Sequence, residues 1–209
     1  QIGILPSRGE AKVSIWDDIL GAVKMGWTDL EIMEKWPAHA VRCQSAIAKL
    51  RLKIEKESQS WRDVETVYLS GATGTGKTRY VMETYGYANV YRVQTYDTGA
   101  FDMYDGEEIV LFEEFRNGFK VEQMLNFLDG YPCQLPARYA NKMAKFTKIF
   151  IASNWDLMEQ YKGVQVNYPS TWEALLRRID GRAEVLDDSM CFTMSSGELR
   201  VEQLPWMIN

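Results

Sequence analysis

The chain has 209 residues, with 46% hydrophobic residues, 25% charged residues and a formal net charge of −5. This composition is ordinary for a soluble globular protein, and the net charge argues against a surface that is uniformly adapted to nucleic acid. No apolar run approaches the roughly 20 residues that cross a bilayer. The three separated cysteines and the single histidine exclude a disulfide framework and a zinc site built on several histidines.

The first 25 residues have the pattern of a linker followed by a helix. Residues 1–12 are polar and contain proline and glycine, so we expect them to be the remnant of a linker. Ile15, Ile19 and Val23 are spaced four residues apart, which predicts a helix over about 13–25.

Two further helices are expected before residue 59. Thr28-x-x-Glu31 is a capping box that opens a helix ending near Pro37. The next helix runs over about 38–57, and its apolar positions form a narrow seam: Ala40, Cys43, Ile47, Leu50 and Ile54. We therefore predict a small helical module over residues 13–58. The seam suits either the core of a plain bundle or a collar that joins subunits.

After residue 58, strands alternate with helices. Buried strands are predicted at 67–70, 90–93, 109–112 and 148–152. Helices are predicted from about Lys77, over the apolar positions between 121 and 128, and after a second capping box, Ser170-x-x-Glu173. This alternation predicts that residues 59–209 form one α/β domain with a parallel sheet covered on both faces.

Residues 71–78 have the sequence of a phosphate-binding loop. Its residues are Gly71, Ala72, Thr73, Gly74, Thr75, Gly76, Lys77 and Thr78. The glycines let successive backbone N–H groups point at phosphate oxygens, and the following helix adds its positive end. Lys77 is expected to reach the β- and γ-phosphates, and the Thr78 hydroxyl to bind Mg²⁺. The loop lies between a strand and a helix, as this motif requires, so we predict an ATPase that uses ATP and Mg²⁺.

Polar residues follow two of the predicted strands at the carboxyl ends, where open α/β sheets bind ligands. Glu113 and Glu114 follow the strand 109–112, and neighbouring residues on a strand point in opposite directions. We assign Glu113 to the water shell of the magnesium ion and Glu114 to polarising the attacking water. Asn154 ends the next strand, and its amide is expected to bond the γ-phosphate and the water.

Cations are grouped in two places after the acidic pair. Arg177 and Arg178 lie on the last predicted helix, and either one can face the nucleotide of a neighbouring subunit, or both can be ordinary surface residues. The segment 130–155 lacks Asp and Glu, and its basic residues are Arg138, Lys142, Lys145 and Lys148. Such a segment is either a solvated face or a local nucleic-acid contact.

The order of these motifs resembles the superfamily 3 helicase domain of replication initiator (Rep) proteins from small circular single-stranded-DNA viruses and related rolling-circle plasmids. The resemblance covers about residues 61–182. Besides the phosphate loop, the acidic strand and the Ser-Asn strand end, it extends to Phe101-Asp102-Met103-Tyr104-Asp105-Gly106-Glu107-Glu108, Tyr131-Pro132, Arg138-Tyr139-Ala140-Asn141-Lys142 and Ala174-Leu175-Leu176-Arg177-Arg178-Ile179.

The resemblance implies an AAA+-type P-loop ATPase fold, preceded by a helical oligomerisation module at 13–58. It implies a homo-oligomeric ring, a hexamer by analogy, that moves 3′→5′ along single-stranded DNA. Lys142 would lie on a hairpin loop that grips the DNA backbone in the central channel, assisted by Arg138, Lys145 and Lys148. The site of action would be the host nucleus for a eukaryotic virus or the bacterial cytoplasm for a plasmid.

The chain departs from this family in two respects. Both members of the acidic pair are Glu, where family members usually carry Asp, which leaves the division of roles between Glu113 and Glu114 open. The nuclease domain expected in the parent protein needs two metal-binding histidines, and the chain has only His39. We therefore expect that domain to be absent from this chain.

Four other functions are compatible with a phosphate loop. A GTPase switch is disfavoured because Asn141-Lys142-Met143-Ala144 lacks the acid of the guanine-recognition motif, and a small-molecule kinase is disfavoured because no segment resembles a lid. An RNA-directed ATPase of the same superfamily would typically carry membrane-binding or zinc-binding appendages. A non-enzymatic assembly protein would not require Lys77, Glu114 and Asn154 together.

Overall fold

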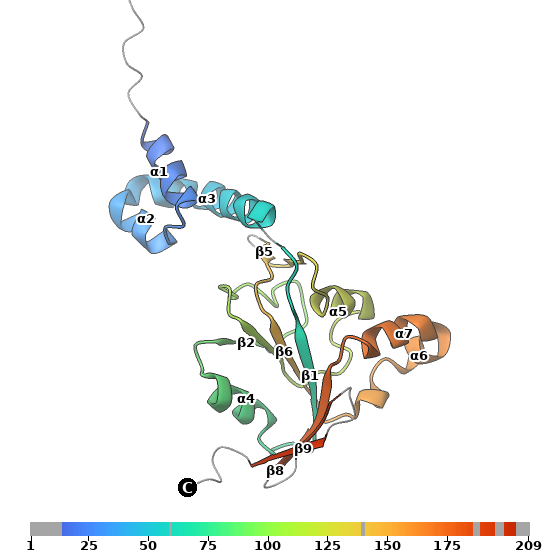
Figure 1. The fold of residues 1–209 in the computed structure, drawn as a ribbon. Helices are drawn as coiled ribbons and strands as arrows, with labels where there is room; N and C mark the ends of the chain where they lie inside the picture. The colour runs from blue at the N-terminus through green and yellow to red at the C-terminus, as the bar shows by residue number, and fades with distance from the viewer. Residues whose placement is uncertain (1–13, 59, 139–140, 186–188, 195–198, 204–209) are drawn as a thin grey trace, which may run out of the picture. The chain divides into compact units, whose positions relative to one another are not determined.

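The computed structural model of the chain describes residues 14–58, 60–138, 141–185, 189–194 and 199–203 (Figure 1). The chain forms two compact units that divide after Ser58. The expected linker at 1–12 lies outside the described residues. Within the described ranges, no helix is both long enough and apolar enough to cross a membrane.

The first unit consists of three helices, α1 (Ile15–Lys24), α2 (Asp29–Lys35) and α3 (Pro37–Ser58). The predicted capping box of α2 is confirmed. The Thr28 hydroxyl accepts a hydrogen bond from the Glu31 N–H, and the Glu31 carboxylate accepts one from the Thr28 N–H at 2.7 Å. These bonds satisfy two backbone donors that the first turn of a helix otherwise leaves unpaired.

The seam of α3 packs inside this unit. Ala40 and Ile47 are buried in a core with residues of α1 and α2, and Leu50 and Ile54 pack against the same core. At Cys43 the backbone leaves helical geometry (φ −115°, ψ 16°), which kinks α3. The core of the unit therefore accounts for these seam positions, while a collar that joins subunits stays a prediction.

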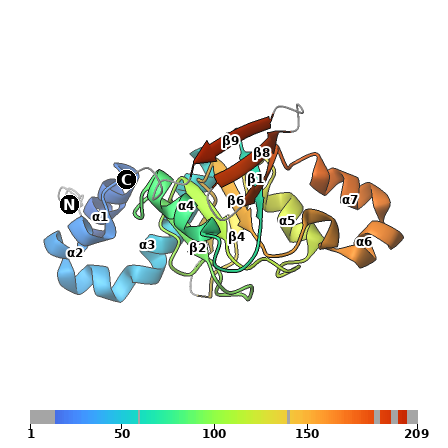
Figure 2. The same ribbon diagram turned by 90° about the horizontal axis from the view of Figure 1, so that it is seen from below.

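The second unit is built on a seven-stranded sheet of order β2-β3-β6-β1-β7-β8-β9. Its strands are β1 (Glu65–Ser70), β2 (Val90–Val93), β3 (Ile109–Phe112), β6 (Lys148–Ala152), β7 (Gly181–Val185), β8 (Ser189–Met194) and β9 (Leu199–Gln203). The first five in sheet order are parallel, and β8 and β9 continue the sheet as antiparallel strands (Figure 2). The predicted fold class, α/β with a parallel sheet preceded by helices, is confirmed.

Helices cover both faces of this sheet. Val67 and Leu69 of β1 pack with α4 (Lys77–Tyr85) on one face, whereas Tyr68 points to the other face. That second face is covered by α5 (Val121–Phe127) and α7 (Pro169–Leu176) (Figure 1). The remaining short elements are the hairpin strands β4 (Gln134–Leu135) and β5 (Lys142–Met143), the 3₁₀ turn η1 (Leu157–Glu159) and α6 (Lys162–Asn167).

The capping box predicted at Ser170 is wrong. α7 begins at Pro169, its N-cap residue is Tyr168, and no side chain caps it. Proline is favoured at the first helical position because its fixed φ suits the helix and its missing N–H would have no partner there. Pro169 therefore starts the helix two residues earlier than a Ser170 cap would and places Ser170 inside the first turn.

Candidate active site

The phosphate loop connects β1 to α4. Gly71 has a φ of +148°, and a Cβ atom there would stand 2.6 Å from the Val185 carbonyl oxygen, so any other residue would clash with the neighbouring strand. Gly76 adopts the left-handed conformation (φ +94°) as the N-cap of α4. The loop therefore ends directly on the N-terminus of α4, where the helix dipole favours an anion.

Lys77 is buried and folds back onto its own loop. Its ammonium donates hydrogen bonds to the carbonyl oxygens of Gly71 and Ala72, both at 2.8 Å. Burial lowers the pKa of Lys77, and the negative charge of Glu114 works against that shift. Both of these acceptors are neutral carbonyls, and charge-assisted bonds to phosphate oxygens would be stronger.

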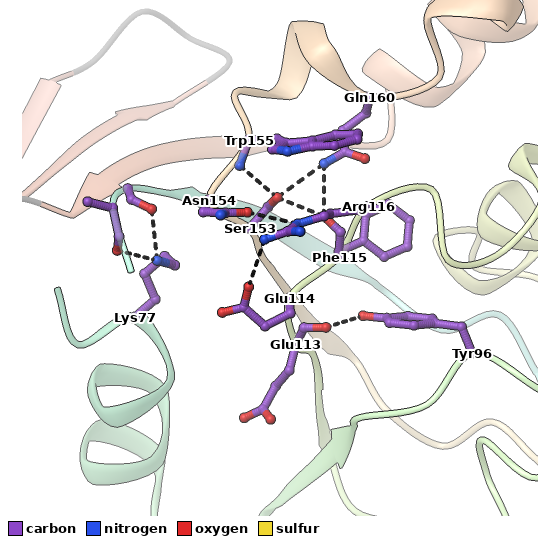
Figure 3. A network of polar contacts seen from close by, with 12 residues as sticks. Lys77, Tyr96, Glu113, Glu114, Phe115, Arg116, Ser153, Asn154, Trp155 and Gln160 are labelled. Atoms are coloured by element: carbon purple, nitrogen blue, oxygen red, sulfur yellow. Dashed lines mark hydrogen bonds and ion pairs between the residues drawn. The ribbon is translucent and has the colours of Figure 1, made fainter. Parts of the chain in front are cut away.

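The two acids after β3 face different partners. The Glu113 carboxylate accepts two hydrogen bonds from the Arg92 guanidinium, at 2.7 and 2.9 Å, and one from Gln94 at 3.3 Å. Glu114 has a left-handed backbone (φ +46°) and turns its carboxylate toward the side where Lys77 and Asn154 lie (Figure 3). Of the two acids, Glu114 is therefore the one that the fold directs at the phosphate loop.

The two predicted magnesium ligands, Thr78 and Glu113, do not face each other in the structure. Thr78 lies half-buried in the first turn of α4, next to Lys77. The Glu113 carboxylate is paired with Arg92, so it would have to leave that pair to reach an ion beside Thr78. Figure 3 shows its side chain directed away from that of Glu114. Its assignment to the magnesium shell stays a prediction.

Arg116 belongs to this site, although sequence reasoning did not identify it. Its Nε donates to the Asn154 side-chain oxygen at 3.0 Å, and one of its terminal nitrogens lies 3.7 Å from a Glu114 carboxylate oxygen (Figure 3). The guanidinium also lies 5.8 Å from the centre of the Trp155 ring. Arg116 therefore links the polar ends of β3 and β6. The sequence signal that could have identified Arg116 is its position, two residues after the acidic pair.

A buried polar network supports these two strand ends. The Ser153 hydroxyl donates to the Phe115 carbonyl at 2.7 Å. The Gln160 side chain, 1% exposed, donates to the Tyr68 hydroxyl at 2.8 Å. It also bonds the Phe115 carbonyl and the Ser153 hydroxyl (Figure 3). Buried polar groups of this kind must be paired, so the network fixes the chain on either side of Glu114 and Asn154.

Replacing Gln160 with leucine is expected to destabilise this unit. The substitution leaves buried oxygens of Tyr68, Phe115 and Ser153 with fewer donors, which should lower the free energy of unfolding by about 2–4 kcal/mol. Urea denaturation measures the change. The control is Gln134→Leu, at an exposed position of β4, with an expected effect within about 0.5 kcal/mol. Equal stabilities for the two variants would show that the network contributes little.

The structure separates the two arginines of the α7 region. Arg178 forms an ion pair with Asp129 and donates to the Ala174 carbonyl, and this pairing holds the pKa of Asp129 below its usual range. Arg177 is exposed at the C-cap of α7. Of the pair, Arg177 is therefore the exposed residue, and Arg178 is held within its own domain.

The basic segment forms a hairpin packed against its own domain. Leu135 of β4 pairs with Lys142 of β5, whose ammonium bonds the Tyr104 carbonyl. Arg138 donates from its backbone and its guanidinium to the Asp102 carboxylate, at 2.8 and 2.6 Å. Tyr139 and Ala140, which the resemblance places in this segment, lie outside the described residues.

The two remaining basic residues differ in their distance from the hairpin, because the backbone N–H of Lys145 bonds the hydroxyl of Tyr104, the residue that Lys142 also contacts. Lys145 is exposed, with its side chain beside Gly106. Lys148 is the first residue of β6 and pairs with Glu65 at 2.7 Å, at the end of the sheet opposite to Asn154. Three of the four predicted DNA contacts, Arg138, Lys142 and Lys145, therefore lie against one segment, residues 102–106, and Lys148 is the one that pairs elsewhere.

Comparison with known proteins identifies similar families. Residues 67–155 match a family model described as RNA helicase, and this range contains the phosphate loop, the acidic pair and Asn154. The chain is 26% identical to the replication-associated protein of goose circovirus over 159 residues, which covers 75% of this chain and 52% of that protein. It is 27% identical to the replication-associated protein of beak and feather disease virus over 140 residues, which covers 66% and 46%.

A third relative is the replication-associated protein of canary circovirus, 27% identical over 161 residues that cover 77% of this chain and 52% of that protein. The chain thus spans about half the length of the curated relatives that it matches. The resemblance to a superfamily 3 helicase domain of replication initiator proteins, inferred from the motifs, is confirmed.

Proposed function

Because residues 67–155 match a helicase family and the chain is similar to circoviral replication-associated proteins, we propose that it is an ATP-dependent DNA helicase. It would move 3′→5′ on single-stranded DNA during rolling-circle replication of a small circular genome. The observation that supports this proposal best is the convergence of Lys77, Glu114 and Asn154 at the carboxyl ends of three adjacent strands, β1, β3 and β6. Ligand sites of open α/β sheets lie at this edge.

In the proposed reaction, the loop amides and Lys77 hold the β- and γ-phosphates of ATP. Glu114 accepts a proton from a water molecule whose oxygen attacks the γ-phosphorus. The bond from that phosphorus to the β–γ bridging oxygen breaks, which yields ADP and phosphate. Asn154 orients the water, and the exposed Arg177 of a neighbouring subunit stabilises the charge of the transition state.

The donor set fits a magnesium ion that arrives with the nucleotide. The described residues contain no cluster of three or more His, Cys, Asp or Glu that could hold a metal by itself. Mg²⁺ commonly uses only one or two protein oxygens, together with phosphates and water. Thr78 and a carboxylate of the Glu113–Glu114 pair would supply those oxygens. When bound, Mg²⁺ neutralises charge on the β- and γ-phosphate oxygens.

The proposed partners are single-stranded DNA and further copies of this chain. Arg138 and Lys142 on the β4–β5 hairpin would contact the DNA backbone, with Lys145 nearby and Lys148 as a more distant candidate. The helical unit at 13–58 and Arg177 would join neighbouring subunits in a ring, for which we propose a hexamer. The host nucleus or a bacterial cytoplasm remains the proposed site of action.

An RNA-directed ATPase of the same superfamily is the second candidate, because the matching family model is described as RNA helicase. Phosphate release measured with single-stranded DNA and with RNA of the same sequence distinguishes the two. Stimulation by DNA supports the proposal. Stimulation by RNA alone would show that RNA, and not DNA, is the substrate. Stimulation by neither would contradict the proposal that the chain acts on a nucleic acid.

The Lys142→Ala variant is expected to bind single-stranded DNA about three- to tenfold more weakly, with unchanged basal ATP hydrolysis, because one phosphate contact is lost. Fluorescence anisotropy of a labelled oligonucleotide, measured over a range of salt concentrations, gives the affinity. In a plot of the logarithm of the binding constant against the logarithm of the salt concentration, the magnitude of the slope should fall by about 0.7. Lys162→Ala, at an exposed position of α6, is the charge-matched control. Unchanged DNA affinity in Lys142→Ala would place the contact elsewhere.

A further inference from the structure

Arg116 contacts both groups that the proposed reaction places around the γ-phosphate. Its Nε bonds the amide oxygen of Asn154 at 3.0 Å, and its terminal nitrogen lies 3.7 Å from the carboxylate of Glu114. Figure 3 shows the guanidinium between these two side chains. One cation therefore lies against both the proposed water-polarising acid and the proposed water-orienting amide.

These contacts of Arg116 are not needed to hold the fold together. Its side chain is 47% exposed and that of Glu114 is 61% exposed, and ion pairs at such positions contribute little to stability. The chain around the site is fixed instead by the buried bonds of Ser153 and Gln160. Arg116 can therefore exchange its partners without disturbing the strand ends.

The position of Arg116 suits a phosphate ligand. A guanidinium presents several donors in one plane and binds phosphate oxygens with two parallel bonds, more strongly than it binds through the long contact to Glu114. The Trp155 ring, 5.8 Å away, offers a surface along which the guanidinium can move. The amide that it bonds belongs to Asn154, two residues after the end of β6. β6 lies next to β1, and β1 leads into the phosphate loop.

We propose that Arg116 binds the terminal phosphate of ATP within its own subunit, and that it gives up its ion pair with Glu114 to do so. This inference rests on the proposed function. While Arg116 is paired with Glu114, its guanidinium occupies the carboxylate that would accept a proton from the attacking water. A γ-phosphate draws the guanidinium away and frees that carboxylate. ADP lacks the γ-phosphate, so the pair persists in its presence.

Discrimination between ATP and ADP tests this role. The full chain and its variants are titrated by calorimetry with a non-hydrolysable ATP analogue and, separately, with ADP, both in the presence of Mg²⁺. Arg116→Ala should bind the analogue about tenfold more weakly, as expected for the loss of a charge-assisted hydrogen bond, while its ADP affinity changes less than about twofold. Arg116→Lys keeps the charge and should recover part of the analogue affinity.

The charge-matched control is Lys162→Ala, at an exposed position of α6, which should bind both nucleotides like the wild type. A general structural defect in Arg116→Ala would weaken both nucleotides equally. That result, or an unchanged affinity for the analogue, would overturn the role of Arg116 and leave the proposed ATPase intact. A wild-type chain that binds neither nucleotide would overturn both.

Discussion

Replacing Lys77 with alanine is expected to reduce ATP hydrolysis by about 1,000-fold or more. Lys77 supplies the positive charge of the loop, and removing a preorganised donor to the transition state costs about 10²–10³-fold even when that donor is neutral. Its ammonium is already buried within the loop, 2.8 Å from the carbonyls of Gly71 and Ala72, so little reorganisation is needed to meet phosphate. Phosphate release at saturating ATP measures the loss.

Two controls separate this effect from a folding defect. Alanine is the best helix former, so α4 should keep its start at residue 77 and the thermal unfolding midpoint should change little. Lys77→Arg keeps the charge, but a planar guanidinium does not reproduce the compact ammonium, so its turnover should also be strongly reduced. Turnover above a tenth of the wild-type rate in a folded Lys77→Ala protein would refute the assigned role.

Glu114→Gln is expected to lower turnover by about 100-fold or more, while nucleotide affinity stays near that of the wild type. The substitution keeps the shape of the side chain and removes only its ability to accept a proton. Glu114 is 61% exposed and turned toward the phosphate loop, so the loss of its charge should not unfold the protein. Single-turnover hydrolysis and equilibrium ATP binding are the two measurements.

Glu113→Gln is the matched comparison, because the two acids are adjacent and differ in their partners. Glu113 is bound by Arg92 and Gln94, so the change weakens that pair and should reduce turnover less than Glu114→Gln does. If Glu113→Gln is the slower enzyme and retains its ATP affinity, the roles of the two acids are reversed.

Local sequence patterns predicted the elements that build the sheet. Apolar runs located β2 and β3 at their observed bounds, and the glycine-rich loop located the start of α4. The strand order was not predicted, because periodicity says nothing about pairing, and β1 lies between β6 and β7, which come much later in the chain. β7 was missed because it alternates buried and exposed residues over only five positions.

The parts of the site that were not predicted depend on contacts between distant residues. Arg116 bonds Asn154, 38 positions away, and Gln160 bonds Tyr68, 92 positions away. Spacing within one segment carries no information about such partners. The resemblance placed Lys142 on a hairpin loop, whereas the structure has it on β5 with its ammonium on the Tyr104 carbonyl. That bond would have to open before Lys142 could grip DNA.

Calorimetric titration of the wild-type chain with Mg·ATP tests the central claim most directly. The convergence of the phosphate loop with Glu114 and Asn154 predicts saturable uptake of one nucleotide per chain, with release of phosphate over time. Circular dichroism of the same sample establishes that the protein is folded. A folded protein that takes up no Mg·ATP would contradict the account, since neither hydrolysis nor DNA unwinding could then follow from this site.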